Sequence, residues 1–227
     1  MTKPIASGHT AVMARRVEPP DSLDFFPTPP WATRALCEHV LRYSSDIAFQ
    51  TVWEPAAGEG HMVGPLSEYF GGVFSSDVFD YGHSVAVGSF VGDGPDVIRW
   101  PQEINRHGPD WIVTNPPFNL GVEFAIRAID EARCGVALLL RSVWMESKDR
   151  YDKLFKHVPS TRIAVFCERV PMTKGRWDPE ASTATSYAWF VWEKPTEICD
   201  RKTQLVWIPP GQRKALEKPD DRKRFAA

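Results

Sequence analysis

The chain has 227 residues, 43% of them hydrophobic, and a formal net charge of −2 at pH 7. This length suits one domain with short extensions, and the hydrophobic share is enough for a sizeable core. The near-neutral charge argues against a protein that binds polyanions through its bulk charge, although a local basic face stays compatible with it.

Several classes of site are not expected. The first residues are polar and lack the apolar core of a signal peptide, and no stretch approaches the roughly 20 apolar residues that span a bilayer. The six histidines show no metal-ligand spacing, so we expect no metal. The cysteines lie far apart, as expected of reduced thiols in a cytoplasmic protein. They are Cys37, Cys134, Cys167 and Cys199.

The chain divides into three parts. Residues 1–22 lack periodicity and are predicted to be a loose N-terminal segment, residues 23–195 form one α/β domain, and residues 196–227 form a C-terminal extension with a flexible basic tail. In chain order, helices are predicted at residues 31–44, 62–70, 122–132 and 150–157. Strands are predicted at residues 51–53, 72–76, 86–91, 111–114, 134–140, 162–166, 187–192 and 204–208. Strands alternating with helices indicate a doubly wound α/β sandwich.

The tetrapeptide Asn115-Pro116-Pro117-Phe118 directly follows the apolar strand predicted at residues 111–114. In open α/β sheets, ligands bind outside the carboxyl ends of the strands. Proline stiffens this turn and biases the preceding asparagine away from the helical region, so its carbonyl groups can be aimed at a ligand. Two acceptors and an aromatic ring suit a planar base with an amino group. The alternative is a proline turn that caps the strand, with Phe118 in the core.

A second candidate site is the turn Glu54–Gly60, which lies between the first central strand and a helix. Glycines there let the backbone approach a ligand closely. Asp77 ends the next strand, where an acidic residue can bind ribose hydroxyls. The charge of Glu54 disfavours a phosphate and favours a cationic or amino-bearing ligand. The alternative is an ordinary turn with glycine at a tight bend.

Together the two motifs resemble those of the S-adenosylmethionine-dependent DNA adenine-N6 methyltransferases. The resemblance covers roughly Asp24 to Glu193, in the motif order of the gamma arrangement. It implies a Rossmann-like methyltransferase sandwich, a mostly parallel seven-stranded sheet with an antiparallel final strand. It implies S-adenosylmethionine as the methyl donor and DNA as the partner. The segment Phe26-Pro27-Thr28-Pro29 resembles the family's segment beside the amino acid end of the donor.

The resemblance also assigns roles to residues. The acidic-glycine turn would hold the methionine part of the donor, Asp77 its ribose, and Asp93, or alternatively Asp96, its adenine amino group. The donor-binding residues are then Phe26, Thr28, Pro29, Glu54, Pro55, Gly58, Gly60, Asp77 and Asp93. The catalytic tetrapeptide of the family corresponds to Asn115, Pro116, Pro117 and Phe118.

Contacts to nucleic acid are predicted in two places. The segment 169–186 combines cations with an aromatic ring, Lys174, Arg176 and Trp177, and Arg141 follows a strand at the same sheet edge as the tetrapeptide. A solvated hairpin loop is the alternative. No segment is long enough for a separate target-recognition domain. Other interpretations remain open: the acceptor is an RNA base or a protein glutamine amide, or the chain is a catalytically silent nucleic-acid-binding module. The oligomeric state is not predicted.

Overall fold

The computed structural model describes residues 24–43, 46–104, 106–194 and 202–225. The predicted loose segment 1–22, Ser44 and Cys199 lie outside these residues. Strands are β1 Thr51–Glu54, β2 Gly72–Asp77, β3 Ala86–Val87, β4 Trp111–Thr114, β5 Gly135–Arg141, β6 Arg162–Phe166, β7 Tyr187–Glu193 and β8 Gln204–Ile208. α-Helices are α1 Pro30–His39, α2 Val63–Leu66, α3 Gly121–Glu131, α4 Lys148–Arg150, α5 Gln212–Leu216 and α6 Pro219–Phe225. Shorter turns of 3-10 helix are η1 Leu41–Tyr43, η2 Ile47–Phe49, η3 Phe118–Leu120 and η4 Ser142–Met145, and η5 Tyr151–Phe155 is π-helical.

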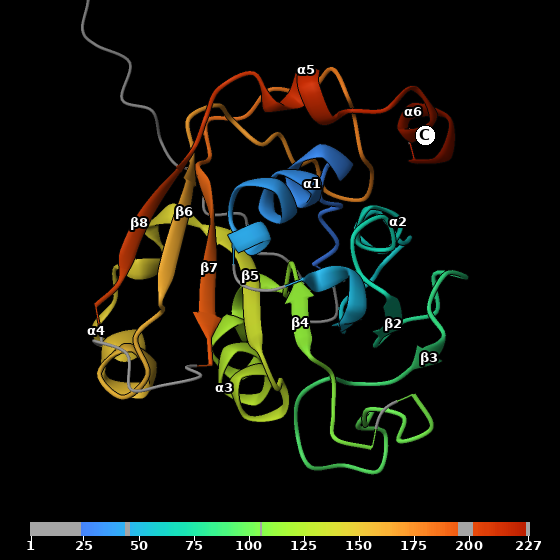
Figure 1. The fold of residues 1–227 in the computed structure, drawn as a ribbon, viewed down its shortest axis with the longest axis vertical. Helices are drawn as coiled ribbons and strands as arrows, with labels where there is room; N and C mark the ends of the chain where they lie inside the picture. Colours follow the sequence, from blue (N-terminus) through green and yellow to red (C-terminus); the bar gives the residue numbers. More distant parts are fainter. Residues whose placement is uncertain (1–23, 44–45, 105, 195–201, 226–227) are drawn as a thin grey trace, which may run out of the picture.

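The described strands form one sheet in the order β3-β2-β1-β4-β5-β7-β6-β8, which Figure 1 shows running from β8 at the left to β3 at the right. All neighbouring pairs are parallel except those of β7, which runs antiparallel to both β5 and β6. The predicted α/β class, with a mostly parallel sheet and an antiparallel strand, is confirmed. Two details of the prediction are corrected. The described sheet has eight strands rather than seven, and its final strand, β8, pairs parallel with β6, so the antiparallel strand is the one before it, β7.

Alternate residues of each central strand point to opposite faces, so the sheet separates two hydrophobic cores. On β4, Val113 packs in the core that α1 and α2 cover, whereas Ile112 packs in the core that α3 and η5 cover. The strand β5 is buried along Gly135–Leu140. This explains its nearly continuous apolar sequence, because a central parallel strand has no solvent-facing side.

The helices depart from their predicted lengths. The α-helix predicted at residues 62–70 covers only Val63–Leu66, and residues 67–70 continue as turns. The first helix ends at His39 and continues as η1. The helix predicted at residues 150–157 is a turn of α4 followed by the π-helical η5. The strand predicted at residues 86–91 is shortened to Ala86–Val87.

The C-terminal residues 202–225 pack onto the domain rather than extending as a solvated tail. Arg34 of α1 is 2% exposed and binds both carboxylate oxygens of Asp221 in α6, at 2.6 and 2.7 Å. The same guanidinium donates to both oxygens of Glu68, each at 2.8 Å, and to the Leu216 carbonyl. All its N–H groups are therefore paired, as a buried charge requires. Figure 1 shows α6 beside α2 at the C-terminal end of the chain.

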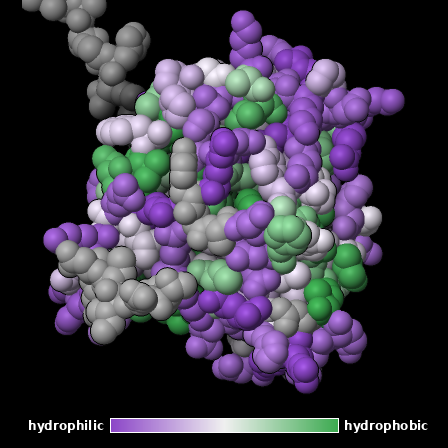
Figure 2. Space-filling view, in the orientation of Figure 1, coloured by the Kyte–Doolittle hydropathy of each residue, from purple (hydrophilic) through white to green (hydrophobic). Residues whose placement is uncertain are grey.

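The surface carries no extended hydrophobic band on the face seen in Figure 2, as far as the described residues show. Hydrophobic side chains gather there in small patches, such as the one over β3, where Val85 and Val87 are exposed. In the described part of the chain, no helix is long and apolar enough to cross a membrane.

Candidate active site

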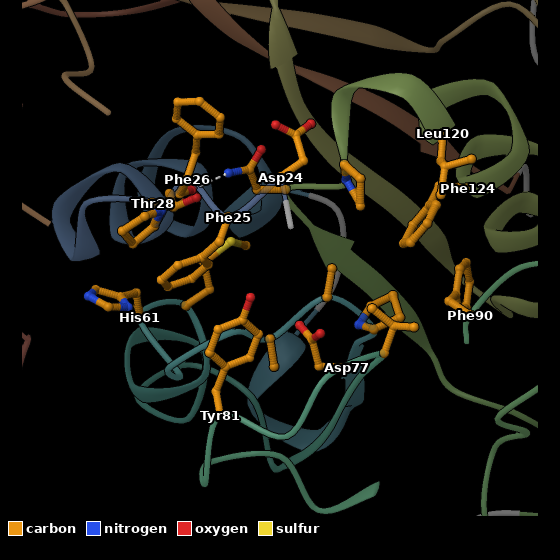
Figure 3. A pocket seen from close by; sticks show the side chains of 18 of the residues that line it. Asp24, Phe25, Phe26, Thr28, His61, Asp77, Tyr81, Phe90, Leu120 and Phe124 are labelled. Atoms are coloured by element: carbon orange, nitrogen blue, oxygen red, sulfur yellow. Dashed lines mark hydrogen bonds between the residues drawn. The ribbon is translucent and has the colours of Figure 1, made fainter. Parts of the chain in front are cut away.

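A pocket lies at the carboxyl edge of the central strands, where both sequence motifs were expected. Six of the predicted site residues line it: Phe26, Thr28, Pro55, Asp77, Asn115 and Pro117. Figure 3 shows that the pocket is elongated, with His61, Phe25 and Tyr81 toward one end, Phe90, Phe124 and Leu120 toward the other, and Asp77 between them. Because β1 lies between β2 and β4, the ends of these three strands meet at one site.

The amide of Asn115 is held in one orientation. Its Nδ2 donates to the Phe26 carbonyl at 2.8 Å, drawn as a dashed line in Figure 3, and lies 3.6 Å from the Met172 sulfur. Its Oδ1 is buried and has no hydrogen-bond partner in the described structure. A buried polar atom is normally paired, so an unpaired acceptor in a pocket indicates a place for a ligand donor.

The N-terminal segment clamps the rest of the tetrapeptide. Asp24 Oδ2 accepts a hydrogen bond from the backbone N–H of Phe118 at 2.7 Å. The Phe26 and Phe118 rings pack with their centroids 5.1 Å apart. Phe118 is half-buried beside the pocket rather than lining it, and Pro116 is buried. The contact from Asp24 was not predicted, because its partner lies 94 residues away in the chain.

The glycine turn is tied to the end of β2. Gly58 has a left-handed backbone, with φ +52°, and its N–H donates to Asp77 Oδ2 at 2.8 Å. The other Asp77 oxygen accepts from the Phe79 N–H at 3.0 Å, and burial raises the pKa of this carboxyl. A Cβ on Gly58 would come within 2.4 Å of the Phe25 ring. Glycine is thus required here for its conformation and for its small size.

Glu54 is completely buried beneath this turn. Its Oε1 accepts from the Ala56 N–H at 3.2 Å. Burial raises the pKa of its carboxyl to about 8, because desolvation penalises the charged form. Four of the predicted donor-binding residues do not line the pocket: Pro29, Glu54, Gly58 and Gly60. The sequence-based argument from the negative charge of Glu54 is therefore not supported, because a raised pKa favours the protonated carboxyl at neutral pH.

His61, which follows the glycine turn, also lines the pocket. Its Nε2 lies 3.3 Å from the Phe225 carbonyl, its Nδ1 is buried without a partner, and burial lowers its pKa to about 4. The Thr28 hydroxyl is a further buried, unpartnered group that lines the pocket. Three pocket-lining side chains thus each have one buried polar atom without a partner in the described structure: Thr28 Oγ1, His61 Nδ1 and Asn115 Oδ1.

The segment predicted to touch nucleic acid folds over the N-terminal side of the pocket. Gly175 N–H donates to the Phe25 carbonyl at 2.9 Å. Trp177 is 2% exposed and packs edge-on against His61, so its ring faces the interior and offers no face to a base. Arg176 is exposed and Lys174 is half-buried. Arg141 lies beside the tetrapeptide, its guanidinium 4.3 Å from the centre of the Phe118 ring.

Asp93 is not brought to the pocket: it is exposed, and Ser89, Phe90 and Val91 line the pocket in this part of the chain. Asp96 does not line the pocket either. Three further residues that line the pocket were not predicted from the sequence. Val78 and Tyr81 follow β2, and Phe124 lies on α3. The position of Val78, directly after Asp77, was the available signal, since ligands contact residues just beyond strand ends. Among the described residues, no group of histidine, cysteine or acidic side chains could hold a metal ion.

Comparison with known proteins gives similarity in structure alone. No protein-family model matches the sequence, and no curated protein matches it. Among solved structures, a protein described as a class I S-adenosylmethionine-dependent methyltransferase from Listeria monocytogenes has 11% identity and a TM-score of 0.53, covering 82% of this chain and 67% of its own.

Two restriction-modification proteins are also similar. The methyltransferase subunit of a type I system from Streptococcus thermophilus has 10% identity and a TM-score of 0.54, covering 79% of this chain and 46% of its own. A type I modification subunit from Vibrio vulnificus has 12% identity and a TM-score of 0.53, covering 88% and 51%. The chain thus spans about half the length of these subunits. These likenesses show that the chain has the fold of class I S-adenosylmethionine-dependent methyltransferases.

Proposed function

We propose that this protein transfers a methyl group from S-adenosylmethionine to the N6 amino group of adenine in DNA. The observation that carries the proposal is the amide of Asn115, whose Nδ2 is anchored to Phe26 and whose Oδ1 is left as a buried, unpaired acceptor. The fold is similar to that of methyltransferases, including DNA modification subunits, and this similarity supports S-adenosylmethionine as the donor and DNA as the substrate in the proposal.

The pocket offers suitable groups to each part of the donor. Its amino acid end would lie by Thr28 and His61, above the buried carboxyl of Glu54, and its ribose by Asp77. Its purine would lie between the apolar side chains at the other end, Val78, Phe90, Val91 and Phe124. Val78 is 61% exposed although it lines the pocket, and a purine would cover it. When bound, S-adenosylmethionine supplies a methyl group on a positively charged sulfur.

The tetrapeptide would act on the target base. Adenine N6 is a weak nucleophile, because its lone pair is delocalised into the ring. Asn115 Oδ1 and the Pro116 carbonyl would accept its two hydrogens, which localises the lone pair on nitrogen and orients it. This is catalysis by positioning and by fixed dipoles, and it needs no covalent intermediate with the protein. The proton of the product amine leaves to water.

The base must leave the helix stack to reach this site. Phe118 would stack on the extruded base, and such stacking contributes about 1–3 kcal/mol, comparable to the cost of unstacking. The Arg141 guanidinium lies over the Phe118 ring. It would move aside when the base stacks there, and in its new position it would contact a phosphate of the DNA. Arg176 and Lys174 would also contact phosphate, whereas Trp177 would act as a buried support of the loop.

The test supplies radiolabelled S-adenosylmethionine with DNA, RNA and protein extract in separate reactions. We expect label in DNA, recovered as N6-methyldeoxyadenosine. If label appears only in RNA or only in protein, that molecule is the methyl acceptor and the DNA assignment is wrong. If the chain binds the donor but label appears in none of the three, the chain is a catalytically silent nucleic-acid-binding module.

The matched variants are Asn115→Ala and Asn119→Ala, since Asn119 is exposed four residues further on. Asn115→Ala should lower the methylation rate by about 10²-fold or more while donor binding persists, as expected for loss of a preorganised polar group. Asn119→Ala should retain activity. Full turnover by Asn115→Ala would refute the proposed role of the tetrapeptide.

A further inference from the structure

One wall of the pocket is built from a chain segment with little regular structure. The described residues between Val78 and Asp110 contain the two-residue strand β3, an isolated bridge between Ser89 and Val97, and no helix. Yet Ser89, Phe90 and Val91 of this segment line the pocket. A wall without helix or extended ladder needs other contacts to hold its shape.

Arg127 of α3 supplies such contacts from outside the segment. Its Nη1 donates to the Phe90 carbonyl, and its Nη2 donates to the Ile98 carbonyl at 2.6 Å. Its Nε donates to Glu131 Oε1 at 2.7 Å, one helical turn further along α3. The side chain of Arg127 is 15% exposed, so these hydrogen bonds are largely shielded from water. The guanidinium thereby joins two carbonyls of the irregular segment to a regular helix.

The same guanidinium also stacks on the ring of the residue it binds. Its central carbon lies 4.5 Å from the centre of the Phe90 ring and 5.8 Å from that of Trp53. Phe90 is 2% exposed, meets Trp53 edge-on at 5.1 Å and packs on Phe124 at 4.8 Å. The backbone and the ring of Phe90 are thus fixed together. A planar fork is needed for this arrangement, because the point charge of lysine cannot stack and bridge two carbonyls in the same way.

Phe90 lies at the end of the pocket away from His61, beside Phe124, as Figure 3 shows. This end presents apolar and aromatic surfaces suited to a flat heterocycle. We propose that Arg127 is a positioning residue for the purine half of the methyl donor, acting through Phe90. The inference rests on the proposed function, because it requires that the pocket hold an adenosine-containing donor.

The experiment compares two ligands that share an adenosine half. S-Adenosylhomocysteine also carries the amino acid half, whereas 5′-methylthioadenosine lacks it. Calorimetric titration of the full chain should show that R127K and R127Q weaken both ligands by a similar factor, about tenfold, the size expected for loss of a charge-assisted hydrogen bond. The control is R133K, because Arg133 pairs with Asp110 of the same segment at 2.8 Å but does not line the pocket. The affinities of R133K for both ligands should stay within about twofold of the native values, because lysine keeps the charge beside Asp110 and neither residue lines the pocket.

Kinetics separate positioning from general loss of stability. In R127K the donor KM should rise about tenfold, with kcat at saturating donor changed less than about threefold, because only donor binding is affected. In an F90L background, R127K should weaken ligand binding by a smaller factor than it does in the native chain, since the ring on which the guanidinium stacks is gone. A loss of kcat with unchanged KM, or weakening of S-adenosylhomocysteine alone, would overturn the inference.

Two further outcomes are distinguishable. If R127K and R127Q both fail to fold, Arg127 serves stability and the inference is overturned. If the native chain binds both ligands and the variants bind them equally well, this inference fails while the proposed function stands. If the native chain binds neither ligand, the proposed function fails and the inference fails with it.

Discussion

The buried carboxyl of Glu54 makes stability depend on pH in a way that one isosteric substitution can isolate. Glu54 is 0% exposed, and burial raises its pKa from 4.5 to about 8. Between these values the folded protein holds a proton that the unfolded chain has released. The contribution of Glu54 to stability is therefore fully present below about pH 4.5 and is lost as the pH rises toward 8. Glu54→Gln mimics the protonated carboxyl and should show no such loss.

The magnitude follows from linkage. Each pH unit within the window costs the native protein up to about 1.4 kcal/mol relative to the variant. From about pH 5.5 to about pH 7.5, the stability of Glu54→Gln relative to the native chain should therefore rise by about 2–3 kcal/mol. Other titrating groups contribute to both proteins and cancel in the difference.

The assay is urea unfolding of both proteins at several pH values, without ligand. A stability difference that stays constant with pH would refute the reasoning, because it would mean that Glu54 has an ordinary pKa in the folded state. The same group should report on the donor: binding S-adenosylhomocysteine, whose amino group is cationic, should release a proton from the native protein near neutral pH. Titration in buffers of different ionisation enthalpy measures this release, which Glu54→Gln should lack.

Three further predictions concern the supports of the site. Gly58→Ala should abolish donor binding, because its Cβ meets Phe25, whereas Gly82→Ala, with the same left-handed backbone and nothing within 4 Å, should cost only the backbone strain of about 1–3 kcal/mol in urea unfolding. Asp221→Ala should destabilise the fold by about 2–3 kcal/mol, because two N–H groups of the buried Arg34 guanidinium lose their acceptors while Glu68 still pairs with it, and Arg42→Ala, at an exposed pair, by less than about 1 kcal/mol; equal values would contradict this. If Arg176 contacts phosphate, Arg176→Ala should reduce the salt dependence of DNA binding by about one unit of slope, and an unchanged slope would remove it from the interface.

The sequence predicts the fold well where a short apolar run ends at a clear turn signal. The β4 strand matches its prediction at both ends, because a run of apolar and β-branched residues ends at a proline turn. The helix predicted at residues 62–70 was too long, because only Val63–Leu66 is α-helical and residues 67–70 continue as turns. The C-terminal residues were predicted to be a flexible tail because of their charge. Asp221 instead pairs with Arg34, which lies 187 residues away in the chain, and a local sequence pattern cannot predict so distant a partner.

The site divides in the same way. Residues that the motifs place at strand ends or in the segment before the first helix, namely Asn115, Asp77 and Thr28, all reach the pocket. Asp93 and Asp96, the candidates for contact with the donor's adenine, do not reach the pocket, because an irregular segment carries no register from which to count. Trp177 shows the opposite error: a cation-rich loop suggested an exposed aromatic residue, but tertiary packing buries the ring against His61.

The two halves of the proposed reaction meet at Phe26. Its side chain belongs to the wall of the donor pocket, its carbonyl fixes the Asn115 amide, and its ring packs on Phe118. A shift of this residue on donor binding would therefore reorient the groups that receive the base. Conversely, a base that stacks on Phe118 would press on the donor wall. In the proposed reaction the segment Asp24–Pro29 would therefore couple the donor and base sites, although it precedes the first strand and carries none of the atoms that would accept the amino hydrogens.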